Sequence, residues 1–112
     1  MTIAEMQHRA WQNSEDKGFH SLPANDNFGT RLALIHSELS EALEAYRETD
    51  RQPFEEWLGK NGKPEGVASE LADVLIRIGD LAEQYGIDLE RAVVQKMDFN
   101  KTREFRHGGK RC

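Results

Sequence analysis

The sequence has a single cysteine, Cys112, at its last position. One cysteine cannot form a disulfide within the chain, so the sequence argues against a disulfide-stabilised secreted domain and fits a reducing compartment. The sequence also lacks a basic and then apolar signal pattern at its start, and no apolar run approaches the roughly 18 residues that a membrane span needs. We therefore expect a cytoplasmic protein without a membrane partner.

Positive charge is scarce as well, with 15 Lys and Arg against 20 Asp and Glu and a formal net charge of -5. Because phosphate backbones are bound by clustered positive charge, we expect no nucleic-acid partner, and any polyanion that this protein binds should come with a metal. The 112 residues, 38% of them hydrophobic, suffice for a modest core, and we predict a single domain over residues 1–112.

Strand-like alternation is absent, and apolar residues instead recur at helical spacing. This spacing predicts four helices, over residues 2–17, 28–48, 64–85 and 88–106. Gly18 and Gly86 can end helices, and Asp88 can cap the last one. The polar connection at residues 49–66 is expected to hold a short helix at residues 54–58. The predicted fold class is all-α, an up-and-down four-helix bundle with one longer central connection.

Apolar stripes indicate which faces pack together. The stripe of the second helix consists of Phe28, Leu32, Ile35, Leu39, Ala42 and Tyr46. The stripe of the third consists of Val67, Leu71, Val74, Leu75, Ile78, Leu81 and Tyr85. We expect these stripes to pack against each other and the last helix to turn Leu89, Val93 and Met97 inward.

The two central helices share a short internal repeat, in which residues 37–43 (SELSEAL) align with residues 69–75 (SELADVL) without gaps. Each copy places two acids three residues apart at the border of the apolar stripe, Glu38 and Glu41 in the first and Glu70 and Asp73 in the second. A single pair of this kind is usually a solvated helix surface, but two copies on successive helices indicate a site.

If the stripes pack together, the four carboxylates converge and need cations to offset their repulsion. Oxygen ligands alone favour magnesium, with manganese or calcium as alternatives, over zinc or copper. A di-iron site is less favoured because neither acidic pair belongs to a Glu-x-x-His motif. His36 has no second His or Cys at ligand spacing, so we do not expect it to bind a metal.

The last helix carries Lys96, Asn100 and Arg103 on one face. These residue types bind phosphate, and opposite a bound metal they would hold a polyphosphate, although a solvated basic face explains them equally well. Trp11, Phe28 and Trp57 are candidates for contact with a nucleobase, but each is explained better as a core residue.

These motifs, with the closing segment FRHGGK at residues 105–110, resemble the MazG-like branch of the all-α nucleoside triphosphate pyrophosphohydrolases over residues 28–112. The resemblance implies cleavage of a nucleoside triphosphate to the monophosphate and pyrophosphate. It also implies that Glu38, Glu41, Glu70 and Asp73 hold magnesium, while Lys96, Asn100 and Arg103 bind the phosphates.

The chain departs from the family at Ser37, where many members carry a glutamate thought to activate water. Serine is not a base at neutral pH, so a metal-bound water, Glu38 or Glu41 must take this role. The small core and the family both favour a homodimer or a dimer of dimers. The competing hypotheses are a non-enzymatic helical interaction module and a metal-dependent phosphohydrolase acting on another nucleotide.

Overall fold

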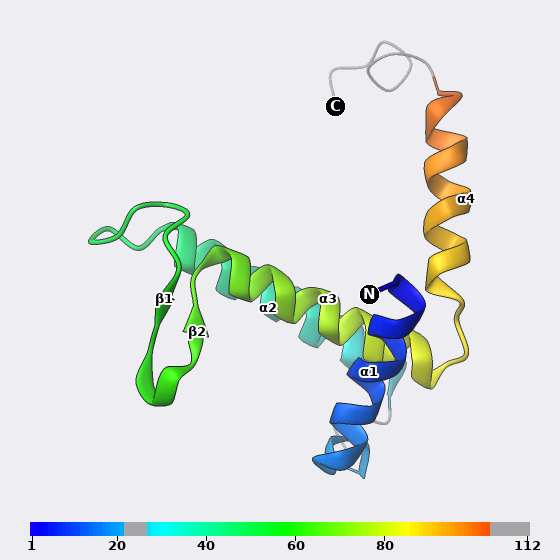
Figure 1. Ribbon diagram of the computed structural model, residues 1–112, viewed down its shortest axis with the longest axis horizontal. Coiled ribbons are helices and arrows are strands. Elements are labelled where there is room, and N and C mark those ends of the chain that lie inside the picture. Colours follow the sequence, from blue (N-terminus) through cyan, green and yellow to red (C-terminus); the bar gives the residue numbers. More distant parts are fainter. Residues whose placement is uncertain (22–26, 104–112) are drawn as a thin grey trace.

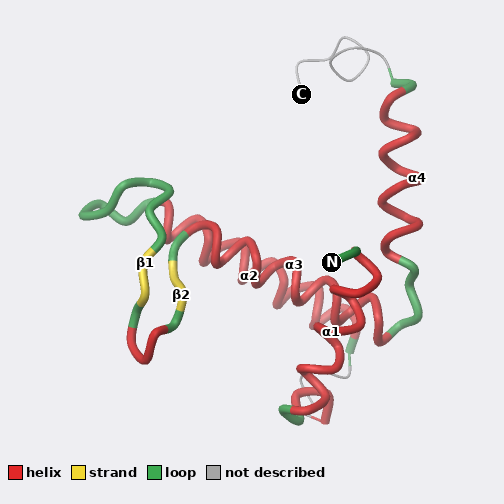
Figure 2. The backbone as a smooth tube through the Cα atoms, viewed as in Figure 1, coloured by secondary structure: helices red, strands yellow, loops and turns green. Residues whose placement is uncertain are grey.

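The computed structural model describes residues 1–21 and 27–103. Within these residues the chain forms four α-helices: α1 (Ile3–Asp16), α2 (Phe28–Tyr46), α3 (Val67–Gln84) and α4 (Leu89–Lys101) (Figure 1). Two short strands, β1 (Trp57–Leu58) and β2 (Pro64–Glu65), pair antiparallel in the central connection (Figure 2). The predicted all-α, four-helix fold is therefore confirmed.

Local sequence signals explain where the helices begin. The side chains of Thr2, Asn27 and Asp88 each accept a hydrogen bond from a backbone N–H in the first turn of α1, α2 and α4. These bonds satisfy donors that have no partner inside the helix. After α3 the chain turns at Gly86, whose φ of 66° lies in the region that favours glycine.

Helix α3 is the centre of the molecule, because α1 and α2 both pack against it. Helices α2 and α3 run side by side, and α1 crosses them at one end (Figure 1). The crossing is close at Gly79, where a Cβ atom would lie 2.7 Å from the sulfur of Met6. The buried apolar residues are few and mostly small: Ala10, Ala42, Val74, Leu81 and Ala82.

The prediction of a short helix at residues 54–58 is wrong. Trp57 and Leu58 pair instead with Glu65 and Pro64, and the Trp57 indole N–H donates to the Glu65 carboxylate at 2.7 Å. The pairing draws Pro64 into a strand, so α3 begins at Val67 rather than at the proline. The Arg51 guanidinium lies 3.8 Å from the centre of the Trp57 ring and anchors its other side.

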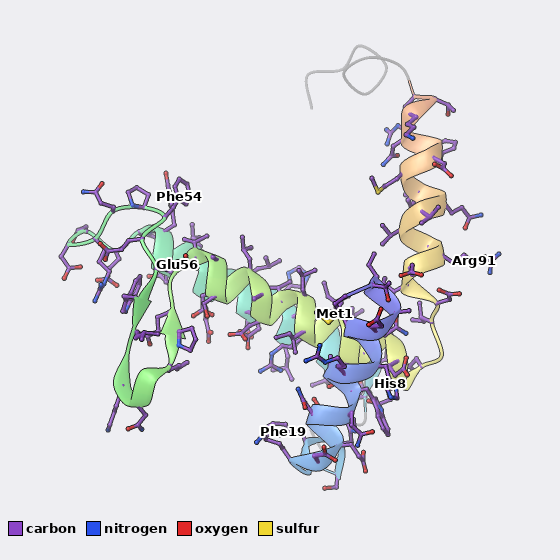
Figure 3. The ribbon with its side chains drawn as sticks, viewed as in Figure 1. Met1, His8, Phe19, Phe54, Glu56 and Arg91 are labelled. Atoms are coloured by element: carbon purple, nitrogen blue, oxygen red, sulfur yellow. The ribbon has the colours of Figure 1, made fainter. Side chains whose placement is uncertain are left out.

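Helix α4 is not packed lengthwise as the bundle prediction required. It projects away from α2 and α3 and makes its main helix contacts with α1 (Figure 1). None of its residues is buried, and side chains such as Arg91 stand clear of the other helices (Figure 3). Leu89 and Val93 are half-buried, but Met97, which was expected to face inward, is 59% exposed.

A buried amide explains this direction of α4. The Gln7 side chain donates to the Ile87 carbonyl at 2.7 Å and accepts from the Leu89 N–H at 3.4 Å. These bonds tie the turn before α4 to α1, so that only the start of α4 lies against another helix. The helix ends at Lys101, and the rest of the predicted extension to residue 106 lies largely outside the described residues.

The stripes of the two central helices are buried only in part. Val74, Leu81 and Ala42 are buried, but the following stripe residues are exposed: Phe28, Leu32, Leu39, Tyr46, Leu71, Leu75 and Tyr85. The radius of gyration is 16.7 Å, whereas a compact chain of this length has about 13 Å. A single chain therefore leaves much of its apolar surface uncovered. None of the described helices combines the length and apolarity required to cross a bilayer.

Candidate metal centre

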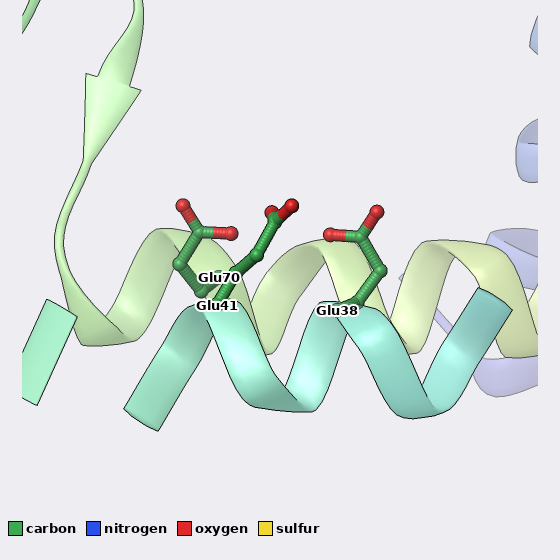
Figure 4. Close-up of side chains that lie close together, drawn as sticks. All are labelled: Glu38, Glu41 and Glu70. Atoms are coloured by element: carbon green, nitrogen blue, oxygen red, sulfur yellow. The ribbon is translucent and has the colours of Figure 1, made fainter. Parts of the chain in front are cut away.

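The acids of the two repeat copies meet between α2 and α3. Glu38, Glu41 and Glu70 each offer a carboxylate oxygen, and these three oxygens lie within 4.8 Å of one another. Figure 4 shows the three carboxylates on the same side of the two helices. Asp73 lines the cavity beside this cluster. The structure thus brings three of the four predicted ligands together and places the fourth next to them.

The members of the cluster differ in their exposure. Glu38 is buried at 8% exposure, Glu70 is half-buried and Glu41 is exposed. The Oε2 atom of Glu70 is buried and has no hydrogen-bond partner among the described residues. A buried carboxylate oxygen without a partner is costly, because it loses hydration and gains nothing in return. A bound cation would remove this cost.

The pKa of Glu70 also shows that its ionised form is unfavourable in this position. Burial raises the pKa of Glu70 above its usual value, and the charges of the three neighbouring acids raise it further, those of Glu41, Asp73 and Glu38 in decreasing order. The nearby Lys63 lowers this pKa in part. In the absence of a stronger cation, Glu70 therefore resists ionisation.

The donor set suits a hard divalent cation. All four side chains supply carboxylate oxygens, which magnesium, manganese and calcium prefer. Two helices supply the ligands from residues one turn apart, so the backbone positions are fixed before an ion arrives. The buried Glu70 oxygen, which has no hydrogen-bond partner among the described residues, would be free to contact such an ion. Glu38, Glu41 and Glu70 are the residues that would hold it, with Asp73 beside them at the cavity.

A cavity of about 590 Å³ adjoins the acids and carries positive charge as well. Its walls include Lys63, Arg31 and Arg77. None of these three residues belongs to the acidic repeat or to the basic face predicted on the last helix. Arg77 stands four residues after Asp73, so helical spacing could have revealed it. Lys63 comes from the turn before β2, and Arg31 lies about two turns before Glu38 on α2. Only the tertiary structure shows that both line the cavity.

The end of the cavity away from the acids is held by a network of charged side chains. Arg31 pairs with Asp80 at 2.9 Å and also donates to Gln84. The two ring nitrogens of His20 lie 2.7 Å from carboxylate oxygens of Asp80 and Glu15. Ionised carboxylates only accept hydrogen bonds, so this geometry requires both ring nitrogens to donate, as in the imidazolium form.

The pKa of His20 agrees with this geometry. Burial lowers the pKa, but the hydrogen bonds to Glu15 and Asp80 and the charges of these carboxylates outweigh burial and raise it above 6.5. The cationic ring fixes the short 3-10 turn η1 (Phe19–Ser21), which borders the cavity, to α1 and α3.

The predicted phosphate-binding residues lie elsewhere. Lys96 and Asn100 are on α4, and Arg103 follows its end. None of the three lines the cavity at the acids, because the described part of α4 projects away from α2 and α3 (Figure 1). Within one chain, the structure does not bring them to the cluster.

The predicted base-contacting aromatics are also outside the cavity wall. Trp11 stacks on His20, Phe28 packs edge-on against Tyr85, and Trp57 belongs to the β1–β2 hairpin. The aromatic residue that lines the cavity is Phe19.

No protein-family model, curated protein or solved structure matches the chain.

Proposed function

We propose that the protein is a magnesium-dependent nucleoside triphosphate pyrophosphohydrolase of the MazG-like kind. In this reaction a (deoxy)nucleoside triphosphate is cut between its α- and β-phosphates to give the monophosphate and pyrophosphate. The observation that carries the proposal is the meeting of Glu38, Glu41 and Glu70 from two helices, with one oxygen of each within 4.8 Å of the others. In addition, a buried Glu70 oxygen has no hydrogen-bond partner in the part of the chain that the structure describes.

The four acids have a shared role in this proposal, which is to bind the metal. Glu38, Glu41, Glu70 and Asp73 would hold magnesium, which would supply positive charge at the phosphates and make a water molecule more acidic for the attack. The fold supplies little covalent chemistry of its own, and catalysis comes from positioning and charge. Lys63 and Arg77, which line the same cavity, are placed to offset the charge of the leaving pyrophosphate.

The attacking water also has to lose a proton. Ser37, which occupies the position of the usual family glutamate, donates its hydroxyl to the Leu34 carbonyl at 2.7 Å on an exposed part of the helix. That bond leaves no role for Ser37 as a base. In our proposal Glu38 or Glu41 accepts the proton, because these are the carboxylates of α2 that face the cavity.

The cavity favours a nucleotide over a bare polyphosphate. Its volume of about 590 Å³ lies within the roughly 300–1,000 Å³ of small-molecule sites. Apolar side chains of Leu34, Ile35 and Ile76 line it next to the charged groups. The triphosphate then lies along the acids and cations, and the nucleoside covers the apolar wall.

We also propose that the protein works as a homodimer or a dimer of dimers. The exposed stripe residues of α2 and α3 form an apolar surface, with Leu39 at 47% and Leu75 at 58% exposure. Helix α4 adds exposed Val94, Met97 and Phe99. Apolar area of this extent on a chain with so small a core favours burial against a second copy.

A second copy would allow the basic residues of α4 to take part in the site. Helix α4 projects away from the cavity of its own chain, so in this proposal Lys96, Asn100 and Arg103 bind the phosphates held at the acids of a neighbouring copy.

Mixing two inactive variants, Glu41→Gln and Lys96→Ala, tests whether each site is shared between two chains. Random mixing in a dimer should restore about a quarter of the wild-type activity if each site combines two chains. No activity in the mixture would place every site within one chain.

The reaction itself is tested with Glu41→Gln, which removes one ligand charge at an exposed position. Pyrophosphate release from a panel of common and modified triphosphates should disappear, while the helical circular dichroism spectrum stays unchanged. Glu44→Gln is the matched control, since Glu44 lies on the same helix, 73% exposed in its side chain and paired with Arg47.

The product distinguishes the competing functions. Pyrophosphate and a monophosphate support the proposed reaction, and orthophosphate indicates a phosphohydrolase of another class. Full activity in Glu41→Gln would contradict the assignment of the site. An interaction module predicts no product and no stabilisation by magnesium.

A further inference from the structure

We propose that Arg77 is an exchangeable counter-ion, which neutralises Glu38 before a metal binds and turns to the substrate phosphates afterwards. This inference rests on the proposed function, because it assigns Glu38 to the metal. It assigns Arg77 two successive roles, first to position the Glu38 carboxylate and then to position the substrate phosphates. Neither the acidic repeat nor the basic face of α4 includes this residue.

The ion pair between α2 and α3 is the first observation. The Arg77 Nε atom lies 2.7 Å from Glu38 Oε1. The two side chains differ in their exposed fraction, which is 11% for Glu38 and 47% for Arg77, so Arg77 has more room to change its conformation. Glu38 is thus held within the packed helices, whereas a long, half-exposed arginine side chain can leave the pair by rotating about its own bonds.

The second observation is the charge balance of the cluster. Among the described residues, Arg77–Glu38 is the one ion pair between an arginine or lysine and the four acids. Lys63 is another cation at the cluster, and it acts on Glu70 through its charge. Arg77 therefore occupies one carboxylate oxygen of Glu38, and its guanidinium would repel a divalent cation bound to the same carboxylate.

The third observation is the position of Arg77 on the wall of the cavity that receives the substrate. One turn of α3 separates it from Asp73, so it stands beside the acids on the same face. A guanidinium released from Glu38 meets the next available anion, and a triphosphate on the metal supplies two oxygens for its planar fork.

Opposite effects on two ligands follow from this exchange. Without the positive charge of Arg77, the acids should bind a divalent cation alone more tightly. The same change should weaken binding of the metal triphosphate complex, because a phosphate contact is lost. An ion pair that only joins α2 to α3 would not give this combination, since its loss would disturb both ligands in the same direction.

The experiment measures both ligands with Arg77→Gln. Mn²⁺ alone is titrated by electron paramagnetic resonance, and a triphosphate with a methylene bridge between its α- and β-phosphates is titrated by calorimetry with saturating Mg²⁺. We expect Mn²⁺ to bind about 3- to 10-fold more tightly and the triphosphate analogue about 10-fold more weakly. Circular dichroism reports folding.

Two further variants sharpen the result. Arg77→Lys keeps the charge but not the fork, so Mn²⁺ affinity should return to the wild-type value while the analogue still binds more weakly. Arg47→Gln removes an exposed arginine that pairs with Glu44 on α2, and it should change neither affinity.

The possible failures are distinct. Equal Mn²⁺ affinity in wild type and Arg77→Gln, or a parallel loss of both ligands, would overturn the role of Arg77 and leave the proposed function standing. Absence of Mn²⁺ binding to the wild-type protein would overturn the metal site, and with it both proposals.

Discussion

Replacing Glu70 with glutamine should stabilise the metal-free protein and remove much of its response to magnesium. The wild-type carboxylate has a buried oxygen without a hydrogen-bond partner in residues 1–21 and 27–103, and it lies close to Glu38 and Glu41. The amide of Glu70→Gln has nearly the same shape, carries no charge and can donate hydrogen bonds to the neighbouring carboxylates. The substitution thus relieves repulsion without leaving a cavity.

The magnitude follows from the spacing of the acids. At 4.8 Å, the upper limit of the distances between the clustered oxygens, two unit charges repel by about 3 kcal/mol at an effective dielectric constant of about 20, and by about 1 kcal/mol in water. Arg77 and Lys63 offset part of this repulsion, and Glu41 is exposed. We therefore expect the free energy of unfolding at pH 7 to rise by about 1–3 kcal/mol, or the Tm by about 4 °C for each kcal/mol.

The pH dependence has a defined sign. Because the fold raises the pKa of Glu70 above 4.5, the folded state takes up a proton before the unfolded state does. The penalty is present in full at neutral pH, declines as pH falls through the raised pKa, and is gone below about 4.5. The advantage of Glu70→Gln over the wild type should decline over the same interval.

Thermal and urea unfolding, with and without Mg²⁺, measure both effects. At ten times its Kd, Mg²⁺ should stabilise the wild type by about 1.4 kcal/mol, and it should stabilise Glu70→Gln less. Glu44→Gln is the control and should match the wild type in both conditions. A metal-free Glu70→Gln protein less stable than the wild type, or one with an equal gain from Mg²⁺, would refute the reasoning.

Other regions of the molecule yield three further predictions. In urea unfolding, His20→Gln should lower the free energy of unfolding by about 1–2 kcal/mol at pH 6 and by less at pH 8.5. The reason is that the fold raises the pKa of His20, so the stabilising imidazolium is present at pH 6 and is lost as pH rises. An equal loss at both pH values would argue against this. Gly66→Ala should lower the Tm more than Gly62→Ala, since both glycines have positive φ but only at residue 66 would a Cβ meet a backbone oxygen, at 2.6 Å. Leu75→Asp should shift sedimentation toward a smaller species, whereas Leu58→Asp, at an exposed position in β1, should not.

Metal binding and folding are coupled if these expectations hold. The chain has a small core, an acidic cleft at the junction of its two longest helices, and an apolar surface that one copy does not cover. A cation at the acids would join α2 to α3 where the fold otherwise holds like charges together. The same ion would supply the chemistry that we propose.

Much of the site was predictable because its pattern is local. Acids three residues apart at the border of an apolar stripe stay at that border in any helix, and two such stripes pack together to bury what they can. The meeting of Glu38, Glu41 and Glu70 follows from these two rules. The helix starts at Thr2 and Asp88 are also local, since each cap bonds within its own first turn.

What the sequence determined by itself, then, is the set of helices and the facing of the two acidic repeats, because both depend on residues within a few turns of each other. The direction of α4 depends on Gln7 bonding to Ile87 and Leu89 about 80 residues away. The basic wall of the cavity depends on Arg31 meeting Asp80 across two helices. Contacts between distant residues leave no periodic trace in the sequence. Only the tertiary structure therefore decided that Lys63 and the Arg31–Asp80 pair stand at the cavity beside the acids, and that Lys96, Asn100 and Arg103 of the same chain do not.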